Sequence, residues 1–557
     1  MQHFPAGRLV TLALVMLAGR INAQNTIGLV EFANDHADGY VLIYPDQQGT
    51  MYLLNACGEV VHTWPDSTSV PGNGSRLVAN GSVLRTYVDE AGGNPFFTAG
   101  GNGEHVQLKD WDNTVLWDYT VSSATECMHH DAEMLPNGNV MIIVWELKTI
   151  QEAYDAGRDT TGFGYNTLWP EKVVEVQPLA PDSGTVVWEW HVWDHLIQDN
   201  DPLAQNFGVV ADHPELVDIN KVYTQNNNPD WLHINSIDYN PALDQIMLSV
   251  PFLNEVWIID HSTTTAEAAG HTGGISGKGG DLLYRWGNAA IYDRGLPSDQ
   301  QLFFNHAALW TGPGLDPGDQ DSGKIMVFNN RVQPGVSAID LFAPPMDSTG
   351  NYALQPGAAF GPTEREKRYA LQTPTDFSSP GQGSGQLLPN GHVLATSGRQ
   401  GWVVSIRPDS TVAWSYVTPM IDGVPVAQGT DIVDRTILFQ AEWVHPDDDR
   451  LDGRVLDAIG YLELDPDTLF CSFPMASPNI IGSSGDWVSV VDDRLVLGPE
   501  LRNERRYRLI DIAGKTVKLG SDSDLRQGIG LAGMPAGMYL IQFDNGTAPR
   551  KFVVPGR

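Results

Sequence analysis

The chain has 557 residues, with 33 Lys and Arg against 68 Asp and Glu, which gives a formal net charge of −35. This acid excess argues against a nucleic-acid-binding protein, which needs a basic surface to contact phosphates. Hydrophobic residues make up 42% of the chain, so it is not disordered, and three Cys cannot form a disulfide-dense scaffold. The length exceeds that of one ordinary domain and favours a large core with an accessory module.

The N-terminus predicts an export signal over residues 1–23. Arg8 supplies the positive start, an apolar run covers residues 9–18, and Ala23 is a small residue suited to cleavage. About ten apolar residues are too few to cross a bilayer, which takes ~20. A buried first strand or helix is the alternative. No later stretch approaches transmembrane length, so we expect a protein that is secreted or held at the cell surface without a transmembrane segment.

The body of the chain, residues 24–480, has short strand-like runs bounded by Gly, Pro, Asn and Asp. An apolar run, Asn-Gly and a second apolar run recur at residues 77–84, 134–141 and 387–394 (with Pro before Asn-Gly in the last two). Because Asn-Gly adopts positive φ at low cost, each copy predicts a two-strand hairpin. The clearest helix candidate, residues 146–158, lies in an insertion and is expected to cover part of a rim.

A second recurring pattern is a strand that carries a Trp shortly after a turn. The copies are unevenly spaced, which fits units of about 45–50 residues with some insertions. Such units predict an all-β fold, a β-propeller of about six blades, because radial closure leaves few exposed strand edges. Two β-sandwiches in tandem are the alternative. The Trp residues of this pattern are Trp64, Trp117, Trp188, Trp286 and Trp414.

Three stretches place histidine beside polar partners at the start of an apolar run. They contain the pair His129 and His130, then His233, then His306. The innermost strands of a propeller begin beside the central channel, so three blades would bring their imidazoles together there. Imidazole can act as an acid, a base or a nucleophile. A structural role for each histidine is the alternative, and the wide separations lack the spacing of a helical zinc site, so we predict no metal ligands.

These stretches resemble the bacterial arylsulfate sulfotransferases, over most of residues 35–470. The resemblance implies a six-bladed propeller with its site in the channel. It also implies transfer of a sulfuryl group from an aryl sulfate to a phenolic acceptor without a nucleotide donor or other cofactor. The chain has no Gly-x-x-x-x-Gly-Lys-Ser/Thr phosphate loop, in agreement. The motifs that carry the resemblance are His129-His130-Asp131 before Leu-Pro-Asn-Gly, the run Trp-Leu-His-Ile-Asn-Ser-Ile-Asp-Tyr-Asn-Pro that starts at Trp231, and Asn305-His306-Ala307 with the run Ile-Met-Val-Phe-Asn-Asn-Arg that ends at Arg331.

The resemblance assigns roles to individual residues. His306 matches the nucleophile, which forms a transient sulfohistidine. His233 and Asn235 match groups that bind the sulfuryl oxygens and stabilise the transferring group. A further channel histidine is matched by either His129 or His130, and His130 is the preferred one.

The chemistry requires cations or hydrogen-bond donors as well as a nucleophile. A sulfate ester spreads one negative charge over three oxygens, and transfer by analogy with phosphoryl transfer passes through a loose transition state. The family carries an Arg where this chain has Pro251, 18 residues after His233. Arg331 and Arg399 are the candidates to supply the missing charge. The aromatic candidates to pack against phenol rings are Trp231, Phe303, Phe304 and Trp310.

The C-terminal part, residues 481–557, has a different charge balance. From Arg494 onward there are 11 Lys and Arg against 6 Asp and Glu, which marks a domain boundary. Strand-like runs at residues 506–512, 537–543 and 550–554, with a turn at Ala513-Gly514-Lys515, predict a small β-sandwich. Their order resembles the C-terminal sorting domains of cargo for the type IX secretion system, which implies export by that machinery. An ordinary adhesive β-domain is the alternative.

Two other classes of function stay open. One is a propeller that binds extracellular ligands or glycans without chemistry, and the other is a metal-dependent hydrolase or quinone-dependent dehydrogenase. The three cysteines, Cys57, Cys127 and Cys471, are odd in number, so their pairing is not predicted.

Overall fold

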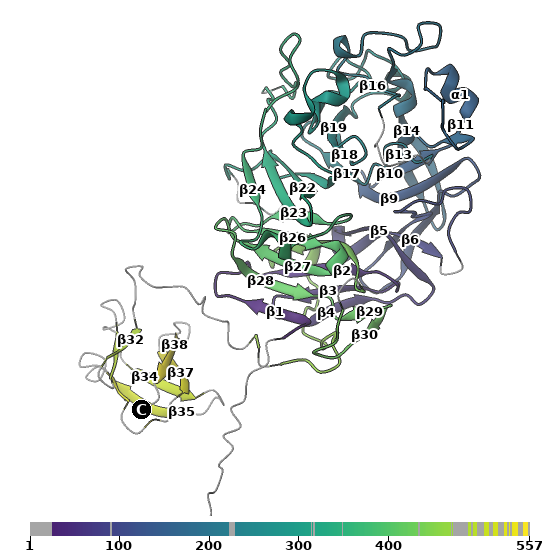
Figure 1. Cartoon of the computed structure of the whole chain (residues 1–557). Coiled ribbons are helices and arrows are strands. Elements are labelled where there is room, and N and C mark those ends of the chain that lie inside the picture. The colour runs from purple at the N-terminus through teal and green to yellow at the C-terminus, as the bar shows by residue number, and fades with distance from the viewer. Residues whose placement is uncertain are drawn as a thin grey trace, which may run out of the picture. The chain divides into compact units, whose positions relative to one another are not determined.

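The computed structural model describes residues 25–471, apart from 90–91, 222–228, 313–314, 316–317, 348, 433–434 and 469, together with the strands of the C-terminal part and residues 531 and 534. The predicted export signal and the predicted turn at Ala513-Gly514-Lys515 lie outside the described residues. The chain divides into two compact units, Met1–Met475 and Ala476–Arg557 (Figure 1).

The described residues of the first unit form six antiparallel sheets of four strands, one of which gains a fifth strand. In order across each sheet, three of them contain β5 (Ser69–Val78), β6 (Ser82–Asp89), β7 (His105–Lys109) and β8 (Val115–Thr120); β9 (Glu126–Met134), β10 (Val140–Glu146), β13 (Glu171–Leu179) and β14 (Ser183–His191); and β17 (Ser236–Asn240), β18 (Gln245–Val250), β19 (Glu255–Asp260) and β20 (Tyr284–Trp286). The other three contain β21 (His306–Trp310), β22 (Ile325–Gln333), β23 (Val336–Phe342) and β24 (Lys367–Tyr369); β25 (Ser384–Leu387), β26 (Val393–Ser397), β27 (Trp402–Ile406), β28 (Val412–Val417) and β1 (Gly28–Phe32); and β31 (Leu438–Val444), β2 (Tyr40–Pro45), β3 (Met51–Asn55) and β4 (Val60–Trp64).

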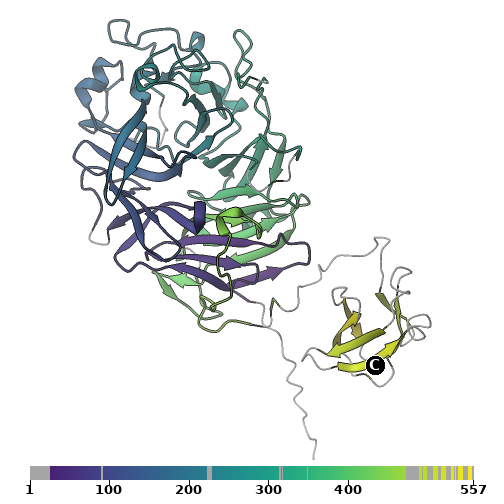
Figure 2. The same cartoon turned by 180° about the vertical axis from the view of Figure 1, so that it is seen from behind.

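The six sheets are arranged as blades around a ring. Their first strands, β5, β9, β17, β21, β25 and β31, contact one another in this order, and β31 contacts β5 again (Figures 1 and 2). Each gap between neighbouring sheets is filled by its own apolar cluster, such as Ile143 and Trp190 packed with Leu248 and Trp257. Each fully buried side chain of this kind contributes roughly 1.5–3 kcal/mol. The predicted all-β propeller is therefore confirmed, and the alternative of two tandem sandwiches is wrong.

The two recurring sequence patterns have fixed places in the blades. The Asn-Gly turns join the first and second strands of three sheets. Asn80 has a positive φ of 59°, whereas in the other two turns the positive φ is at the glycine, Gly138 and Gly391. The Trp residues lie in the fourth strand of five sheets, counted from the strand nearest the ring axis, and they are buried there. Each indole Nε1–H donates to an oxygen at the connection between the third and fourth strands of the next sheet, which ties neighbouring blades together. The donor and acceptor residues are Trp64 and Asp110, Trp117 and Ser183, Trp188 and Thr263, Trp286 and Pro362, and Trp414 and Ala56.

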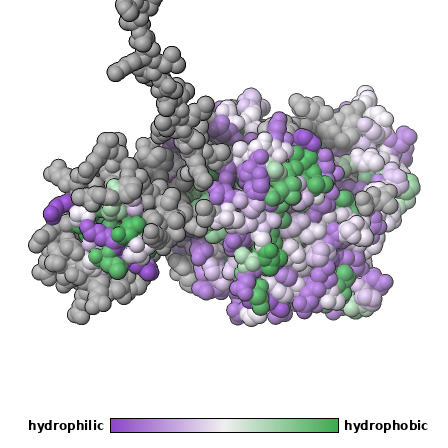
Figure 3. All heavy atoms as spheres, turned by 90° about the horizontal axis from the view of Figure 1, so that it is seen from below, coloured by the Kyte–Doolittle hydropathy of each residue, from purple (hydrophilic) through white to green (hydrophobic). Residues whose placement is uncertain are grey.

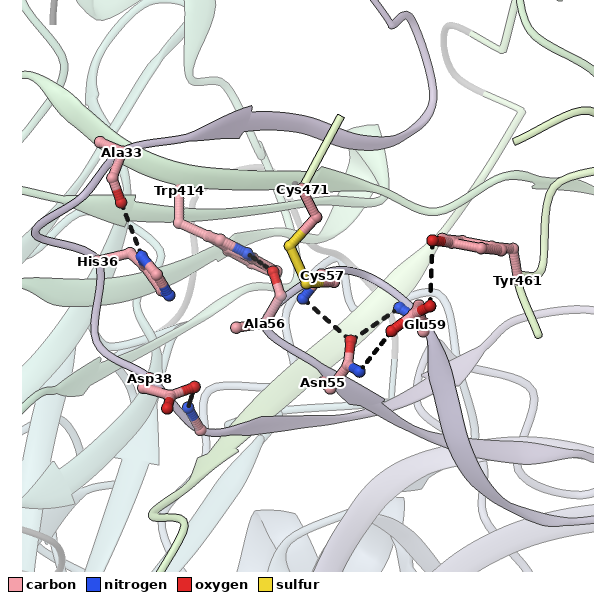
Figure 4. Close-up of a disulfide and its surroundings, with 11 residues drawn as sticks. Ala33, His36, Asp38, Asn55, Ala56, Cys57, Glu59, Trp414, Tyr461 and Cys471 are labelled. Atoms are coloured by element: carbon pink, nitrogen blue, oxygen red, sulfur yellow. Dashed lines mark hydrogen bonds between the residues drawn. A yellow bond between two sulfur atoms is a disulfide. The ribbon is translucent and has the colours of Figure 1, made fainter. Parts of the chain in front are cut away.

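The two ends of the first unit close the ring together. β31 pairs with β2, and β1 pairs with β28, so strands from both ends share two sheets. A disulfide joins Cys57, in the turn between β3 and β4, to Cys471, 414 residues later (Figure 4). Asn55 shapes this turn, since its Oδ1 accepts the Cys57 backbone N–H at 3.0 Å. Cys127 is a buried thiol.

The insertions between strands hold short elements. The predicted helix at residues 146–158 is only partly correct: β10 extends through Glu146, and the helix α1 covers Ile150–Asp155, with Thr149 and Glu152 forming its capping box. The other short strands and helix are β11 (Lys148–Thr149), β12 (Thr167–Leu168), β15 (Leu196–Ile197), β16 (Val217–Asp218), α2 (Thr265–Ala268), β29 (Met420–Ile421) and β30 (Val424–Pro425). The 3₁₀ turns are η1 (Ala79–Gly81), η2 (Val192–Asp194), η3 (Val210–Asp212), η4 (Ala289–Tyr292), η5 (Pro297–Asp299), η6 (Pro374–Asp376), η7 (Gly398–Gln400) and η8 (Asp449–Leu451).

The surface of the first unit agrees with the acidic composition. On the face seen in Figure 3, hydrophilic residues dominate and hydrophobic side chains lie in small separate groups. Among the residues that the structure describes, no helix has the length and apolar composition needed to span a membrane.

The second unit contains two antiparallel sheets. One has the order β32 (Val488–Val491), β33 (Arg494–Leu497) and β36 (Ile529–Gly530), and the other has the order β35 (Thr516–Ser521), β34 (Arg506–Asp511), β37 (Gly537–Phe543) and β38 (Arg550–Val554). Along β34, Tyr507 and Leu509 are buried while Arg508 is exposed, which is the alternation expected of a strand with one face covered. The three strands predicted from the sequence are β34, β37 and β38.

Candidate functional site

Residues of the first strands and of nearby loops meet at a cavity of about 310 Å³. All six sheets contribute, through residues in or directly before β5, β9, β17, β21, β25 and β31. His130, His233, His306 and Arg331 line this cavity, so the structure brings these predicted site residues together. The complete lining is Asn73, Gly100, Gly101, His130, His233, Phe304, His306, Arg331, Pro380, Gly381, Gln382, Arg399 and Phe439.

The backbone around the cavity is strained. His130 and His233 have φ values of 55° and 58°, and Phe304 has 59°. A non-glycine residue in this left-handed region costs roughly 1–3 kcal/mol, and such residues concentrate at functional sites. Gly101 packs so closely that a Cβ there would lie 2.0 Å from His130 Cε1. The chain therefore holds its imidazoles in this cavity at a cost in stability.

His306, the first residue of β21, has a fixed orientation. Its Nδ1 lies 2.8 Å from Oδ1 of Asn330, whose Nδ2 donates to the carbonyls of Ser379 and Gln382 at 2.7 Å each. Because both Nδ2 contacts are to carbonyls, Oδ1 must face the imidazole, and Nδ1 carries the proton. The lone pair is therefore on Nε2, which accepts the backbone N–H of Gln382 at 3.1 Å.

The charge state of His306 suits a nucleophile. Burial, opposed by the hydrogen bond to Asn330, lowers the pKa of His306 to about 3. The ring is therefore neutral at ordinary pH, and Nε2 keeps its lone pair.

His233 is oriented by a carboxylate. Its Nδ1 lies 2.5 Å from Oδ2 of Asp230, which also accepts the indole N–H of Trp145 through Oδ1 at 3.2 Å. The ring stacks on Phe252, with centroids 4.7 Å apart, and meets the edge of His130 at a centroid distance of 4.6 Å. A carboxylate on one ring nitrogen stabilises positive charge that develops on the imidazole, as in a catalytic triad.

His129 does not line the cavity. It is fully buried, stacks on Trp145 at a centroid distance of 3.9 Å, and places its Nδ1 2.9 Å from Nδ1 of His130. Burial lowers the pKa of both histidines well below the ordinary value, so both rings are neutral. His129 Nε2 has no hydrogen-bond partner among the described residues. A buried acceptor without a partner is less costly than a buried donor without one, so Nε2 of His129 has no proton and Nδ1 carries it. His129 Nδ1–H then donates to Nδ1 of His130. The proton of neutral His130 is therefore on Nε2, where it can donate to a ligand in the cavity.

Asn235 is not part of the cavity lining either. It is fully buried, and its Nδ2 donates to the backbone carbonyl of Asn305 at 2.9 Å. The side chain lies outside the residues that line the cavity, and its predicted contact with sulfuryl oxygens stays a prediction. Asn235 instead holds the residue that precedes His306.

Two arginines bring positive charge to the cavity. Arg331 donates from Nε to the carbonyl of Pro380 at 2.8 Å, and its guanidinium lies 3.8 Å from the ring centre of Phe304. Arg399 lines the same cavity. Pro251 begins the turn after β18, next to Phe252, which stacks on His233. Both candidates for the missing charge are thus present.

The aromatic predictions are only partly matched. Phe304 lines the cavity, and so does Phe439, which the sequence analysis did not single out. Trp231 is buried and donates to the Lys221 carbonyl, and Trp310 lines a different cavity.

Three supporting residues were missed by sequence reasoning. Asn330 lies within the run that ends at Arg331, and Asp230 lies three residues before His233, so both were near recognised motifs. Gln382 had no local signal, since it reaches His306 from a loop 76 residues away.

Beyond the cavity, the ring axis is occupied by buried charges. Arg76 of β5 pairs with Asp131 and Glu133 of β9 at 2.7 and 2.8 Å. Burial, opposed by Arg76, raises the pKa of Glu133 to about 8 and that of Asp238 to about 6. These groups join the first strands of neighbouring blades, and they are partnered by Arg76 rather than directed at the histidine cavity.

Comparison with known proteins finds one family model that matches part of the chain. Residues 114–267 match the arylsulfotransferase (ASST) family model. The matched segment contains His129, His130 and His233 and ends before His306, so the family similarity reaches two of the three blades that supply imidazoles. No curated protein matches the chain.

The similarity to solved structures is weak. A protein of unknown function from Bacteroides caccae has 11% identity and a TM-score of 0.38, over 73% of this chain and 99% of that one. The β-propeller domain of Myceliophteria thermophila Cps50 (Swd1) has 10% identity and a TM-score of 0.35, over 72% and 89%. A virginiamycin B lyase from Staphylococcus aureus has 8% identity and a TM-score of 0.29, over 70% and 88%. Similarity this low carries nothing about function.

Proposed function

We propose that this protein is an arylsulfotransferase that moves a sulfuryl group from an aryl sulfate ester to a phenolic acceptor through a sulfohistidine at His306. The observation that carries the proposal is the convergence of His130, His233 and His306 with two arginines on one cavity. The family match over residues 114–267 supports the same class of reaction.

In the first half-reaction, Nε2 of His306 attacks the sulfur of the donor. The N–S bond forms, the S–O bond to the aryl group breaks, and the aryl oxide leaves as an anion that accepts a hydrogen bond from Nε2–H of His130. The donor displaces the contact between Nε2 of His306 and the Gln382 N–H, which is then free to donate to a sulfuryl oxygen.

The second half-reaction reverses these steps with a new acceptor. The acceptor phenol passes its proton to the released aryl oxide, and the resulting phenolate, held by Nε2–H of His130, attacks the sulfur. The N–S bond breaks, and the electron pair returns to Nε2 of His306. Atoms and charges balance over the two steps, and no nucleotide takes part.

Arg331 and Arg399 bind the sulfate charge. The protein as a whole is strongly acidic, so it repels anions at long range and local cations must overcome this. Each charged hydrogen bond contributes roughly 1.5–3 kcal/mol. In this role the two arginines replace the family Arg, whose position is taken by Pro251.

We further propose that the protein is exported, with residues 1–23 as its signal and the C-terminal unit as a type IX sorting domain. The disulfide between Cys57 and Cys471 supports an oxidising location, because such bonds are rare in reducing compartments. The antiparallel sheet formed by β34, β37 and β38 agrees with the strand order on which the sorting-domain resemblance rests.

The test uses the full chain with 4-nitrophenyl sulfate as donor and phenol as acceptor. We expect release of nitrophenolate, sulfation of phenol, and a sulfuryl adduct in the intact mass when the acceptor is omitted. His306→Asn should abolish all three, whereas His213→Asn, at an exposed position, should abolish none. Absence of both transfer and adduct in the wild type would favour a propeller that only binds ligands, and full turnover by His306→Asn would remove His306 from the role.

A further inference from the structure

A second cluster of ionisable groups lies outside the histidine cavity, beside β14 and the connection from β19 to β20. It consists of His195, which follows η2, and His271 and Asp281 from that connection. One ligand atom from each residue lies within 4.8 Å of the others. None of the three lines the proposed transfer site.

His195 shows why this cluster calls for a cation. Its side chain is fully buried, and its Nε2 lies 2.8 Å from the carbonyl of Ala268. A carbonyl only accepts, so Nε2 carries the proton, and in a neutral ring Nδ1 then holds a lone pair. That lone pair faces Oδ1 of Asp281 at 2.9 Å. Two acceptors this close need a positive charge between them.

His271 brings a second imidazole to the same oxygen. Its Nδ1 lies 2.8 Å from Oδ1 of Asp281, and its side chain is 61% exposed. Hydrogen bonds are the alternative, since a protonated His195 and an Nδ1–H on His271 would satisfy the two contacts. A divalent ion satisfies two imidazole nitrogens and one carboxylate oxygen at once, and the exposed side of His271 leaves room for water as a further ligand.

The surrounding backbone holds these groups close together. The N–H of Gly280 donates to the carbonyl of Gly270, and the indole N–H of Trp190 donates to the carbonyl of Gly280 at 2.7 Å. A Cβ at Gly280 would lie 2.0 Å from the carbonyl oxygen of Ala268, so only glycine permits this approach. The bond from His195 Nε2 to a backbone carbonyl is the outer contact that orients most metal-bound histidines.

We propose that His195, His271 and Asp281 form a binding site for a divalent zinc-type ion, which fastens the connection between β19 and β20 to the blade of β14. Two imidazoles and one carboxylate are a donor set that zinc prefers over calcium or magnesium. The three ligands come from segments separated by 76 and 10 residues, so the ion binds only the folded chain and stabilises it. This structural site is independent of the proposed sulfuryl transfer.

The experiment uses the full chain without a polyhistidine tag, freed of metal by a chelator that is then removed. We expect one Zn²⁺ bound per chain by metal analysis, and a Tm that rises by a few degrees with Zn²⁺ but not with Mg²⁺. His271→Asn should lose both effects, and it should fold because the side chain is exposed. His213→Asn, which removes an exposed histidine beside Glu215, is the matched control and should keep both.

Two results would overturn the proposal. A wild-type chain with no zinc-dependent change in Tm and no bound ion would mean that a protonated His195 paired with Asp281 accounts for the cluster. Equal zinc binding by the wild type and His271→Asn would mean that the ion binds elsewhere.

Discussion

Asn330 fixes the chemical form of His306: its Oδ1 lies 2.8 Å from Nδ1 of the ring, and its own amide nitrogen is bound to two carbonyls. Asn330 belongs to β22, the strand next to the one that begins with His306. The second strand of the blade thus selects the tautomer of a residue on the first. On the proposed mechanism this keeps the lone pair of Nε2 toward the cavity.

Asn330→Ala should lower kcat by at least ~10-fold while the KM for the aryl sulfate changes little. The ring loses the acceptor that selects its tautomer, and such acceptors act on turnover rather than on substrate binding. Steady-state kinetics and the rate of adduct formation measure the effect. Asn390→Ala, in the turn before β26, is the control and should behave as wild type. A change confined to KM would contradict this role for Asn330.

The stability of the protein should depend on pH through His306. Its pKa is about 3 in the folded chain and ~6.5 in an unfolded one, so below pH ~6.5 the unfolded state takes up more protons. This group therefore reduces the free energy of unfolding by about 1.4 kcal/mol for each pH unit below that value. Relative to His306→Asn, the wild type should lose about this much between pH 6 and pH 5 in urea unfolding. Parallel curves for the two proteins would show that His306 titrates normally.

Arg331→Gln and Arg399→Gln should each lower kcat/KM for aryl sulfates by about 10–100-fold, the size expected when one charged hydrogen bond is lost. The corresponding Lys variants should recover part of the loss, since they restore the charge without the planar fork. Arg407→Gln, which breaks a pair with Asp35 far from the cavity, should leave kcat/KM unchanged. If either cavity variant matches the wild type, that arginine does not replace the family Arg.

His129→Phe tests whether His129 keeps the proton of His130 on Nε2. Phenylalanine keeps a flat ring against Trp145 but removes the contact to His130 Nδ1. Because His130 is proposed to donate a hydrogen bond to the leaving aryl oxide, the loss of kcat should be larger for phenyl sulfate, whose phenolate is a poor leaving group, than for 4-nitrophenyl sulfate. Equal losses with both donors would assign His129 a role in packing alone.

Cys57→Ser should lower the free energy of unfolding by about 2–4 kcal/mol, because the disulfide restrains the unfolded chain over a loop of 414 residues. A reductant should destabilise the wild type by a similar amount and leave the variant unchanged. The double variant with Cys471→Ser should be no less stable than either single variant, since the two thiols act as one unit. A reductant effect that persists in Cys57→Ser would point to another cause.

Patterns that repeat within a few residues were predictable from the sequence. The Asn-Gly turns and the Trp strands depend on local backbone preference and on which face is buried, so they indicated a propeller before any contact was known. The helix expected over residues 146–158 is shorter, Ile150–Asp155, and starts later because β10 continues through Glu146, where sheet pairing overrides local helix preference.

The candidate site was predictable in its residue types but not in its geometry. His129 and His130 are neighbours on one strand, but their rings contact each other through Nδ1 at 2.9 Å, because the positive φ of His130 and the break in the pairing of β9 with β10 interrupt the strand alternation. The sequence therefore does not show which of the two meets the cavity. Asn235 matched a motif, yet its amide is bound to the backbone of Asn305.

By itself, the sequence determined the strand pattern, the charge and the three histidine stretches, because each of these depends only on composition or on residues that are close along the chain. Only the tertiary structure decided the pairing of Cys57 with Cys471, the bond from Gln382 to His306 and the cluster around Asp281. Each of these contacts joins segments that are distant in the sequence or come from different blades, so it forms only when the blades pack against one another.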